Sequence, residues 1–179
     1  VADMGITGTN LLIEAGADLE TMAELGYGYC RLVAAVPNES PARELGDLAG
    51  MRIATSHPNA TEISFGQRGI ETELVTVSGA VEVAPTMGLA DGVVDLVSSG
   101  STLKMNGLRS VGSLFASQAI LVGRKNASPE AAVIMAEVRT MIEAVIAGRG
   151  VKYLMMNAPT DALAAIEAIL PGLESPSVL

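Results

Sequence analysis

Apolar residues occur in short runs along the chain, and glycine, proline or small polar residues separate these runs. Runs of about four to eight such residues between turn signals predict buried strands. We expect strands at residues 1–8, 29–36, 51–55, 71–77, 93–97, 108–114 and 116–123, and a strand or extended segment at 151–156.

Other segments have apolar residues three or four positions apart, which is the spacing of one helix face. We expect helices at 9–16, 59–68, 128–148 and 160–170, and at 79–89 with an interruption near Pro85. Their expected caps are Thr9 or Asn10, Asn59 or Thr61, Ser128 and Thr160. Alternating strands and helices of this length predict an α/β fold with a parallel sheet covered on both faces.

The most informative stretch is the apolar strand at 93–97, which ends in a loop of small, hydroxyl-rich residues. The loop consists of Ser98, Ser99, Gly100, Ser101 and Thr102. Glycine tolerates a positive φ, and such a loop can turn successive N–H groups towards a phosphate. Asp91 precedes the strand and Asp95 lies within it, so carboxylates accompany the loop. This pattern suits a sugar phosphate as ligand, but the spacing alone leaves a plain Ser/Gly turn as the alternative interpretation.

Composition narrows the classes of protein. The chain has 179 residues, of which 49% are hydrophobic, so it can bury a core in one larger domain or two small lobes. The net charge is −9 with only 11 Lys and Arg residues, which argues against a nucleic-acid partner. The single cysteine, Cys30, excludes an internal disulfide and is compatible with a reducing cytosol. No signal peptide or apolar stretch of membrane-spanning length is evident, so we expect a soluble, cytoplasmic protein without membrane contact.

Several types of site have weak support in the sequence. His57 is the only histidine and precedes a proline, so we interpret it as a surface or cap residue rather than a general base or metal ligand. Cys30 is interpreted as a small buried residue rather than a nucleophile. We therefore predict no metal site made of protein ligands.

Longer segments of the chain are more specific than these patterns. They are DMGITG at 3–8, GYGYCR at 26–31, RIAT at 52–55, GAVEVAP at 79–85, GLAD at 88–91, DLVSSGSTL at 95–103, NGL at 106–108, YLMMNAP at 153–159 and LPG at 170–172. Together and in this order, the segments resemble the ATP phosphoribosyltransferase family over essentially the whole chain.

The resemblance implies a two-lobed α/β fold of the type II periplasmic-binding-protein kind. Residues 29–125 would form lobe II with the phosphoribosyl-binding loop, residues 1–28 and 126–166 would belong to lobe I, and residues 167–179 would be a C-terminal linker. Family members have roughly sixty further residues at their start, so we expect lobe I to be incomplete in this chain. We also expect a C-terminal regulatory domain to begin where this chain stops.

The resemblance further implies an enzyme that transfers the phosphoribosyl group of phosphoribosyl pyrophosphate to N1 of ATP, the first step of histidine biosynthesis. The loop from Ser98 to Thr102 would hold the 5-phosphate, and Asp95 would bind the ribose hydroxyls. Asp91 would support Asp95 or a helix end, and Glu82 would lie near the ribose. Mg²⁺ would arrive on the pyrophosphate of the substrate.

By the same resemblance, Asn10, Leu11, Tyr29 and Cys30 would line the nucleotide pocket. Asn10 departs from the family pattern, in which aspartate is common at this position. Family members form dimers and hexamers or bind a separate regulatory subunit, so we expect self-association. A hypothesis from another class is a small-ligand-binding module of the same two-lobed fold without catalysis.

Overall fold

The computed structural model describes residues 2–152 and 154–169. These residues form two compact units, which divide after Ala147. In this described part of the chain, no helix has both the length and the apolar character that a membrane span requires.

The first unit contains a three-stranded sheet near its N-terminus. The strands are β1 (Met4–Gly8), β2 (Leu19–Glu24) and β8 (Ala119–Arg124), and β8 lies between the other two in antiparallel pairing. Helix α1 (Thr9–Ala15) follows β1 directly and ends at Gly16, whose positive φ of 56° is favoured by the absence of a side chain. Helix α4 (Pro129–Ala147) begins shortly after β8.

The same unit contains a five-stranded sheet with the order β5-β4-β6-β3-β7. Its strands are β3 (Cys30–Pro37), β4 (Arg52–Thr55), β5 (Glu73–Thr76), β6 (Gly92–Val97) and β7 (Leu108–Ser117). β4 is parallel to β5 and β6, whereas β3 is antiparallel to both of its neighbours. The sheet is therefore mixed and not parallel throughout as predicted. The chain enters β3 from the three-stranded sheet and not from a covering helix, so β3 runs in the opposite direction to its neighbours.

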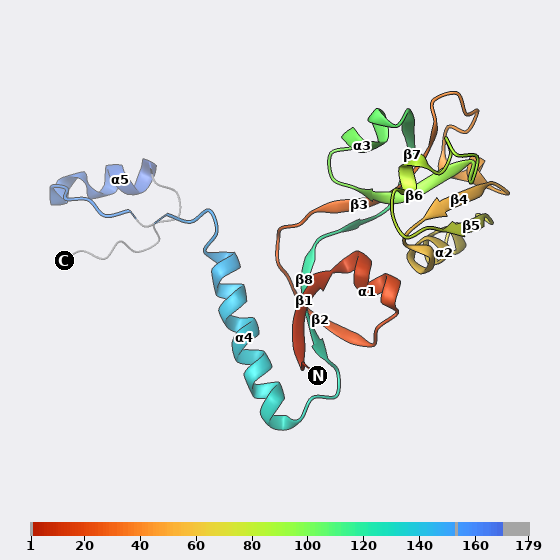
Figure 1. The fold of residues 1–179 in the computed structure, drawn as a ribbon. Helices are drawn as coiled ribbons and strands as arrows, with labels where there is room; N and C mark the ends of the chain where they lie inside the picture. The colour runs from red at the N-terminus through yellow and green to blue at the C-terminus, as the bar shows by residue number, and fades with distance from the viewer. Residues whose placement is uncertain (1, 153, 170–179) are drawn as a thin grey trace. The chain divides into compact units, whose positions relative to one another are not determined.

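Short helical segments cover both faces of this sheet. They are η1 (Leu45–Leu48), α2 (Pro58–Gly66), η2 (Val81–Val83) and α3 (Ser101–Met105). Two clusters of buried side chains include residues of α2 and α3, respectively, so these helices lie on opposite sides of the sheet (Figure 1).

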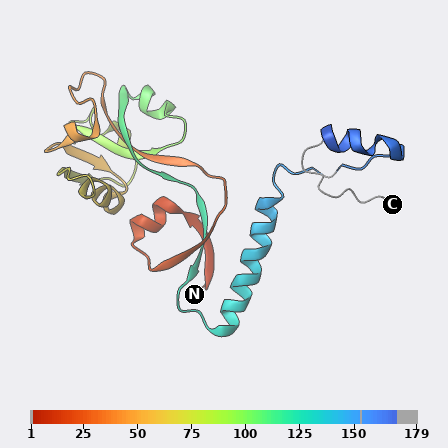
Figure 2. The same cartoon turned by 180° about the vertical axis from the view of Figure 1, so that it is seen from behind.

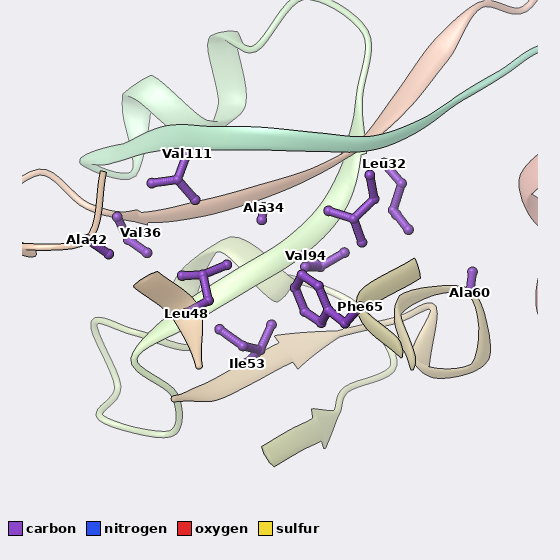
Figure 3. Close-up of a cluster of buried hydrophobic side chains, with 11 residues drawn as sticks. Leu32, Ala34, Val36, Ala42, Leu48, Ile53, Ala60, Phe65, Val94 and Val111 are labelled. Atoms are coloured by element: carbon purple, nitrogen blue, oxygen red, sulfur yellow. The ribbon is translucent and has the colours of Figure 1, made fainter. Parts of the chain in front are cut away.

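Alternation along β3 explains the two clusters. Leu32, Ala34 and Val36 point into the cluster on the α2 side, whereas Val33 and Ala35 point into the other cluster. Figure 3 shows side chains of the α2-side cluster meeting between the sheet and its covering elements. Successive strand residues face opposite sides, so a strand buried on both faces is apolar throughout, as this one is.

Two short segments connect the two sheets. Residues 25–29 lead from β2 to β3, and Gln118 alone separates β7 from β8 (Figures 1 and 2). Main-chain hydrogen bonds join the first connection to the start of β8: Leu25 N–H donates to Ala119 O at 3.0 Å, and Ala119 N–H donates to Tyr27 O at 2.9 Å.

Most of the predicted strands are confirmed, but several elements differ. β2 was not predicted, because its residues are mostly exposed and show no buried alternation. Residues 79–89 contain only the short η2 and turns instead of an interrupted helix. β7 runs to Ser117, so the break between the two strands lies at Gln118, three residues beyond the predicted break at residue 115.

The predicted caps are correct in part. Ser128 Oγ accepts a hydrogen bond from Ala131 N–H at 3.2 Å, as expected of a cap. Helices α1 and α2 instead have Gly8 and His57 at their N-cap positions. In α2 this shift follows from Pro58, whose fixed φ suits the first helical position.

The second unit contains η3 (Thr160–Ala162) and α5 (Leu163–Ile169) in its described part. The described residues of the predicted segment 151–156 form no strand. Position 1 of the first predicted strand, Tyr153, the predicted helix end at Leu170 and most of the predicted linker 167–179 lie outside the described residues.

Candidate functional site

Asp95 extends from β6 towards one face of the five-stranded sheet. On this strand Val93 and Val97 belong to the apolar cluster on the α3 side, and Asp95 lies between them in the same alternation. The carboxylate therefore lies on an otherwise apolar face of the sheet, two residues before β6 ends and the hydroxyl-rich loop begins. Its Oδ1 accepts a hydrogen bond from Leu96 N–H at 2.8 Å.

Burial raises the pKa of the Asp95 carboxyl above its ordinary value. The hydrogen bond from Leu96 N–H opposes this rise in pKa, as a positive charge on His57 would, and the nearby carboxylate of Glu82 adds to it. A half-buried carboxylate near a second carboxylate is a poorly compensated negative charge. Such a group stabilises positive charge that develops beside it.

Glu82 comes to this face from η2, which follows an unusual backbone conformation. Ala80, the N-cap residue of η2, has φ +50°, and it is the one non-glycine residue with positive φ in the described part of the chain. A left-handed conformation is unfavourable for alanine, and such strain is frequent near functional sites.

The loop after β6 turns sharply at Gly100, which has φ +80°. Ser99 Oγ and Ser101 Oγ are 3.0 Å apart and share a hydrogen bond. A pocket of about 160 Å³ lies here, and it is lined by Asp95, Leu96, Val97, Ser98, Ser99, Gly100, Thr102 and Leu103. The structure thus brings Asp95 together with Ser98, Ser99, Gly100 and Thr102 in one pocket. Ser101 does not line this pocket, and Ser101 and Thr102 begin helix α3 instead of lying in a loop as predicted.

Asp91 lies at the other end of β6 from this pocket. The six residues of the strand, Gly92–Val97, separate Asp91 from the loop by about 20 Å. Its carboxylate accepts hydrogen bonds from Arg52, with Nη2 at 2.9 Å from Oδ1 and Nε at 3.3 Å from Oδ2. Hydrogen bonding to Arg52 lowers the pKa of Asp91. The structure therefore does not bring Asp91 together with the loop.

The residues predicted for the nucleotide pocket lie around the connections between the two sheets. Asn10 is buried in α1, and its Oδ1 accepts a hydrogen bond from Ser117 Oγ at 2.9 Å. Ser117 pairs with Cys30 at the start of β3, so Asn10 and Cys30 share a neighbour. Leu11 and Tyr29 have exposed side chains, with 53% and 66% of their surface accessible.

His57 belongs to this region, although the sequence indicated only a surface or cap residue. It occupies the N-cap position of α2 without a side-chain cap bond, and it is buried. Its Nε2 lies 3.4 Å from Asn10 Nδ2, and the ring is near enough to Asp95 for a positive charge on it to act there. His57 therefore lies near both Asn10 and Asp95. These two residues are 47 and 38 positions away in sequence, so no local motif could have revealed this.

Across residues 2–152 and 154–169, no group of three or more His, Cys, Asp or Glu side chains is placed to hold a metal ion.

Comparisons with known proteins point to one family. A family model described as ATP phosphoribosyltransferase matches residues 1–145, and a second model, described as HisG, C-terminal domain, matches residues 148–179. From the resemblance we expected a C-terminal domain to begin only where this chain stops. The second match instead begins at residue 148, within the chain.

Curated relatives agree with this match. The ATP phosphoribosyltransferase of Methanosarcina acetivorans is 41% identical over 99% of this chain and 61% of its own length. The ATP phosphoribosyltransferase of Phocaeicola vulgatus is 42% identical over 100% of this chain and 63% of its own length. The chain thus spans about three fifths of the length of these relatives.

Solved structures give the same fold. The ATP phosphoribosyl transferase (HisG:HisZ) complex from Thermotoga maritima matches with a TM-score of 0.71 and 28% identity, over 82% of this chain and 71% of that chain. The periplasmic aliphatic sulphonate binding protein SsuA from Escherichia coli matches with a TM-score of 0.55 and 17% identity, over 82% of this chain and 55% of that chain. The second likeness shows the fold alone, which is the predicted periplasmic-binding-protein-like fold.

Proposed function

The chain belongs to the ATP phosphoribosyltransferase family, and on this premise we propose that it carries the phosphoribosyl-binding part of that reaction. The phosphoribosyl group of phosphoribosyl pyrophosphate is transferred to N1 of ATP, which gives phosphoribosyl-ATP and pyrophosphate. In this proposal the chain serves the first step of histidine biosynthesis in the cytoplasm.

One observation carries the proposal. The half-buried carboxylate of Asp95 and the loop that turns at Gly100 share one pocket, and the pocket volume is about 160 Å³. The loop hydroxyls and N–H groups suit the 5-phosphate, and the carboxylate suits the ribose hydroxyls. A binder of neutral solutes has no need for this pair of groups.

The charge on these residues suits the chemistry of the transfer. Departure of pyrophosphate from the anomeric carbon leaves positive charge on the sugar ring, and the carboxylates of Asp95 and Glu82 would stabilise it. The attacking ring nitrogen of adenine has a free lone pair, so the new C–N bond forms without a protein general base. Correct placement of the two substrates can supply about 7–11 kcal/mol of the barrier reduction.

The remaining residues have supporting roles in the proposal. Asn10, Leu11, Tyr29 and Cys30 would line the nucleotide site. Mg²⁺ would arrive with the pyrophosphate group, because hard cations often keep substrate and water oxygens as ligands.

Two larger features also belong to the proposal. We propose that residues 29–125 form one lobe, because all strands of the five-stranded sheet lie within that range. The last strand of the range, β8, pairs with β1 and β2 and so extends into the other lobe. Residues 1–28 and 126–166 would contribute to the other lobe. The similar Thermotoga maritima protein was solved as a HisG:HisZ complex, so we also propose that this chain assembles with copies of itself or with a partner subunit.

The test is calorimetric titration of the chain and of Gly100→Val with phosphoribosyl pyrophosphate and Mg²⁺. Valine resists the φ of +80° at this position and fills the anion site, so binding should fall at least about a hundredfold. Gly107→Val is the matched control, since Gly107 has φ +69° outside the pocket and a Cβ there meets no atom within 4 Å. Unchanged binding by Gly100→Val would contradict the assignment of the loop.

A second measurement separates this proposal from the non-catalytic binding module. Thermal shifts are recorded with phosphoribosyl pyrophosphate and Mg²⁺, with ATP, and with a panel of amino acids and unphosphorylated sugars. Stabilisation by phosphoribosyl pyrophosphate supports the transferase. Stabilisation by the panel alone would favour the binding module.

A further inference from the structure

Asn10 and His57 form a buried polar contact between the elements of the two sheets. Asn10 lies on α1 beside the three-stranded sheet, and His57 lies at the start of α2 on the five-stranded sheet. Their exposed fractions are 6% and 8%, and that of Ser117 is 3%. The Asn10 amide lies between the other two, with Oδ1 bonded to Ser117 Oγ and Nδ2 at 3.4 Å from His57 Nε2.

The backbone is fixed at both ends of this contact. Asn10 N–H donates to Ser117 Oγ at 3.0 Å, which holds the start of α1. On the other side, His57 N–H donates to Thr55 Oγ1 at 3.0 Å, and Thr61 Oγ1 donates to His57 O at 2.6 Å. Both threonines are fully buried. The two side chains therefore meet from anchored backbones and have little freedom to rearrange.

Proton counting gives the orientation of the Asn10 amide. The Ser117 hydroxyl oxygen accepts a hydrogen bond from Asn10 N–H. The Ser117 hydroxyl proton is therefore free to be donated, and within the described part of the chain its acceptor is Asn10 Oδ1. A reversed amide would leave that buried hydroxyl proton without an acceptor, which is unfavourable. Asn10 Oδ1 therefore faces Ser117, and the Nδ2 group, which can only donate, faces His57.

The same counting gives the tautomer of His57. Because Asn10 Nδ2 donates, His57 Nε2 must accept and carries no proton. The ring proton then lies on Nδ1, which is 3.0 Å from Ser56 Oγ and donates to it.

We propose that Asn10 is a positioning residue that holds His57 as the neutral Nδ1–H tautomer across the contact between α1 and α2. Gly8 supports this role, because a Cβ at position 8 would overlap Asn10 Oδ1. The glycine at the N-cap of α1 thus leaves room for the amide to reach both partners.

The consequence for Asp95 rests on the proposed function. A protonated imidazole near Asp95 would be a counter-ion for the carboxylate that we assign to the sugar ring. With one nitrogen accepting and the other donating to neutral groups, the imidazole stays uncharged. The charged groups that face this region are Asp95 itself, Glu82, which acts on Asp95, and Glu14 of α1, whose carboxylate binds the N–H groups of Asn59 and Ala60.

The test is a long-range ¹H–¹⁵N correlation spectrum of the imidazole in the full chain near neutral pH. His57 is the only histidine in the sequence, so its signals need no assignment by mutation. We expect the Nδ1–H tautomer in at least about tenfold excess. An excess of the Nε2–H tautomer, or similar amounts of both, would overturn the proposal.

Three variants and one control variant sharpen the test. In Asn10→Asp the side chain can only accept, so Nε2 should carry a proton, either in the Nε2–H tautomer or in the imidazolium. An unchanged spectrum would refute the role of Asn10. Ser117→Ala removes the hydroxyl that orients the amide and should populate both tautomers. Gly8→Ala should do the same, whereas Gly5→Ala, at which a Cβ meets nothing within 4 Å, should not. These spectra need no substrate, so failure of the proposed function alone would leave them unchanged.

Discussion

The two sheets of the first unit differ in how completely they are buried. The five-stranded sheet has clusters of buried side chains on both faces, and five successive residues of its strand β3 are buried. In the three-stranded sheet, neither β1 nor β2 contains a buried residue, and only the central β8 does. The difference indicates that the five-stranded sheet carries most of the stability of this unit, and it also carries the Asp95 pocket.

The largest contrast is expected from truncating an apolar side chain in each sheet region. Phe65→Ala removes a side chain that is 2% exposed from the cluster under α2, and it should lower the free energy of unfolding by about 3–5 kcal/mol. Ile6→Ala removes a side chain that is 58% exposed on β1 and should change it by about 0.5 kcal/mol or less. Urea unfolding measures both, and equal losses would refute the contrast.

A smaller contrast is expected from adding a methyl group to each sheet. A Cβ at Gly112 of β7 would lie 2.6 Å from Leu45 Cγ, a branched carbon packed against the core. Gly112→Ala should therefore destabilise the fold by about 1–3 kcal/mol.

Gly123→Ala on β8 provides the matched comparison. The added Cβ would lie 2.6 Å from Met22 Sδ and 2.5 Å from Met135 Cε. Unbranched methionine side chains can move aside, so we expect a loss below about 1 kcal/mol by the same urea measurement. A larger loss than for Gly112→Ala would show that the three-stranded sheet is the more tightly packed one.

The third prediction concerns the charge within the five-stranded sheet. Because burial raises the pKa of Asp95 in the folded state, its contribution to stability is complete below about pH 4, the ordinary range of aspartate, and is lost as the pH rises through the raised pKa. Asp95→Asn should therefore increase stability relative to the unmodified chain near pH 7 and have little effect near pH 3.

Urea unfolding across this pH range tests the prediction for Asp95. Asp18→Asn is the control beside the three-stranded sheet, because the Asp18 side chain is 79% exposed and is paired only at the surface with Lys125. Such pairs contribute at most about 1 kcal/mol. A stability difference for Asp95→Asn that does not depend on pH would contradict the burial argument.

The smallest effects are expected from two exchanges at left-handed backbone positions. Ala80→Gly should stabilise the fold by up to about 1 kcal/mol, because alanine at φ +50° is unfavourable. Gly16→Ala, at φ +56° next to the three-stranded sheet, should destabilise the fold by a similar amount, because alanine is unfavourable at this φ. A Cβ at position 16 meets no atom within 4 Å, so no packing contact offsets or adds to this cost. Differential scanning calorimetry measures both shifts, and a shared sign would show that packing, not φ, decides.

The sequence predicted features that depend on neighbouring residues. The strand at 93–97, the turn at Gly100 and the position of Asp95 beside it follow from a run of apolar residues that ends in small polar ones, and the structure has each of them. β2 was missed because its residues are mostly exposed and it forms by pairing with β8, about a hundred residues away. The antiparallel direction of β3 likewise depends on the connection from the other sheet.

The contact between His57 and Asn10 also could not be predicted from neighbouring residues in the sequence. The Ser-His-Pro turn predicted an exposed position or a cap, and the cap position is correct. Burial of the ring results from α1 packing against the start of α2, and residue 10 is 47 positions away in sequence. Contacts between elements of different sheets exist only after the fold has formed.

The two connections between the sheets differ in length. Residues 25–29 form the longer connection, with left-handed glycines at positions 26 and 28, whereas Gln118 alone joins β7 to β8. A connection of one residue cannot change its span by much, so the adjoining ends of β7 and β8 stay together. Any rotation of one sheet relative to the other would therefore have to occur about Gln118, and it would have to keep or break the hydrogen bonds that join Leu25 and Tyr27 to Ala119.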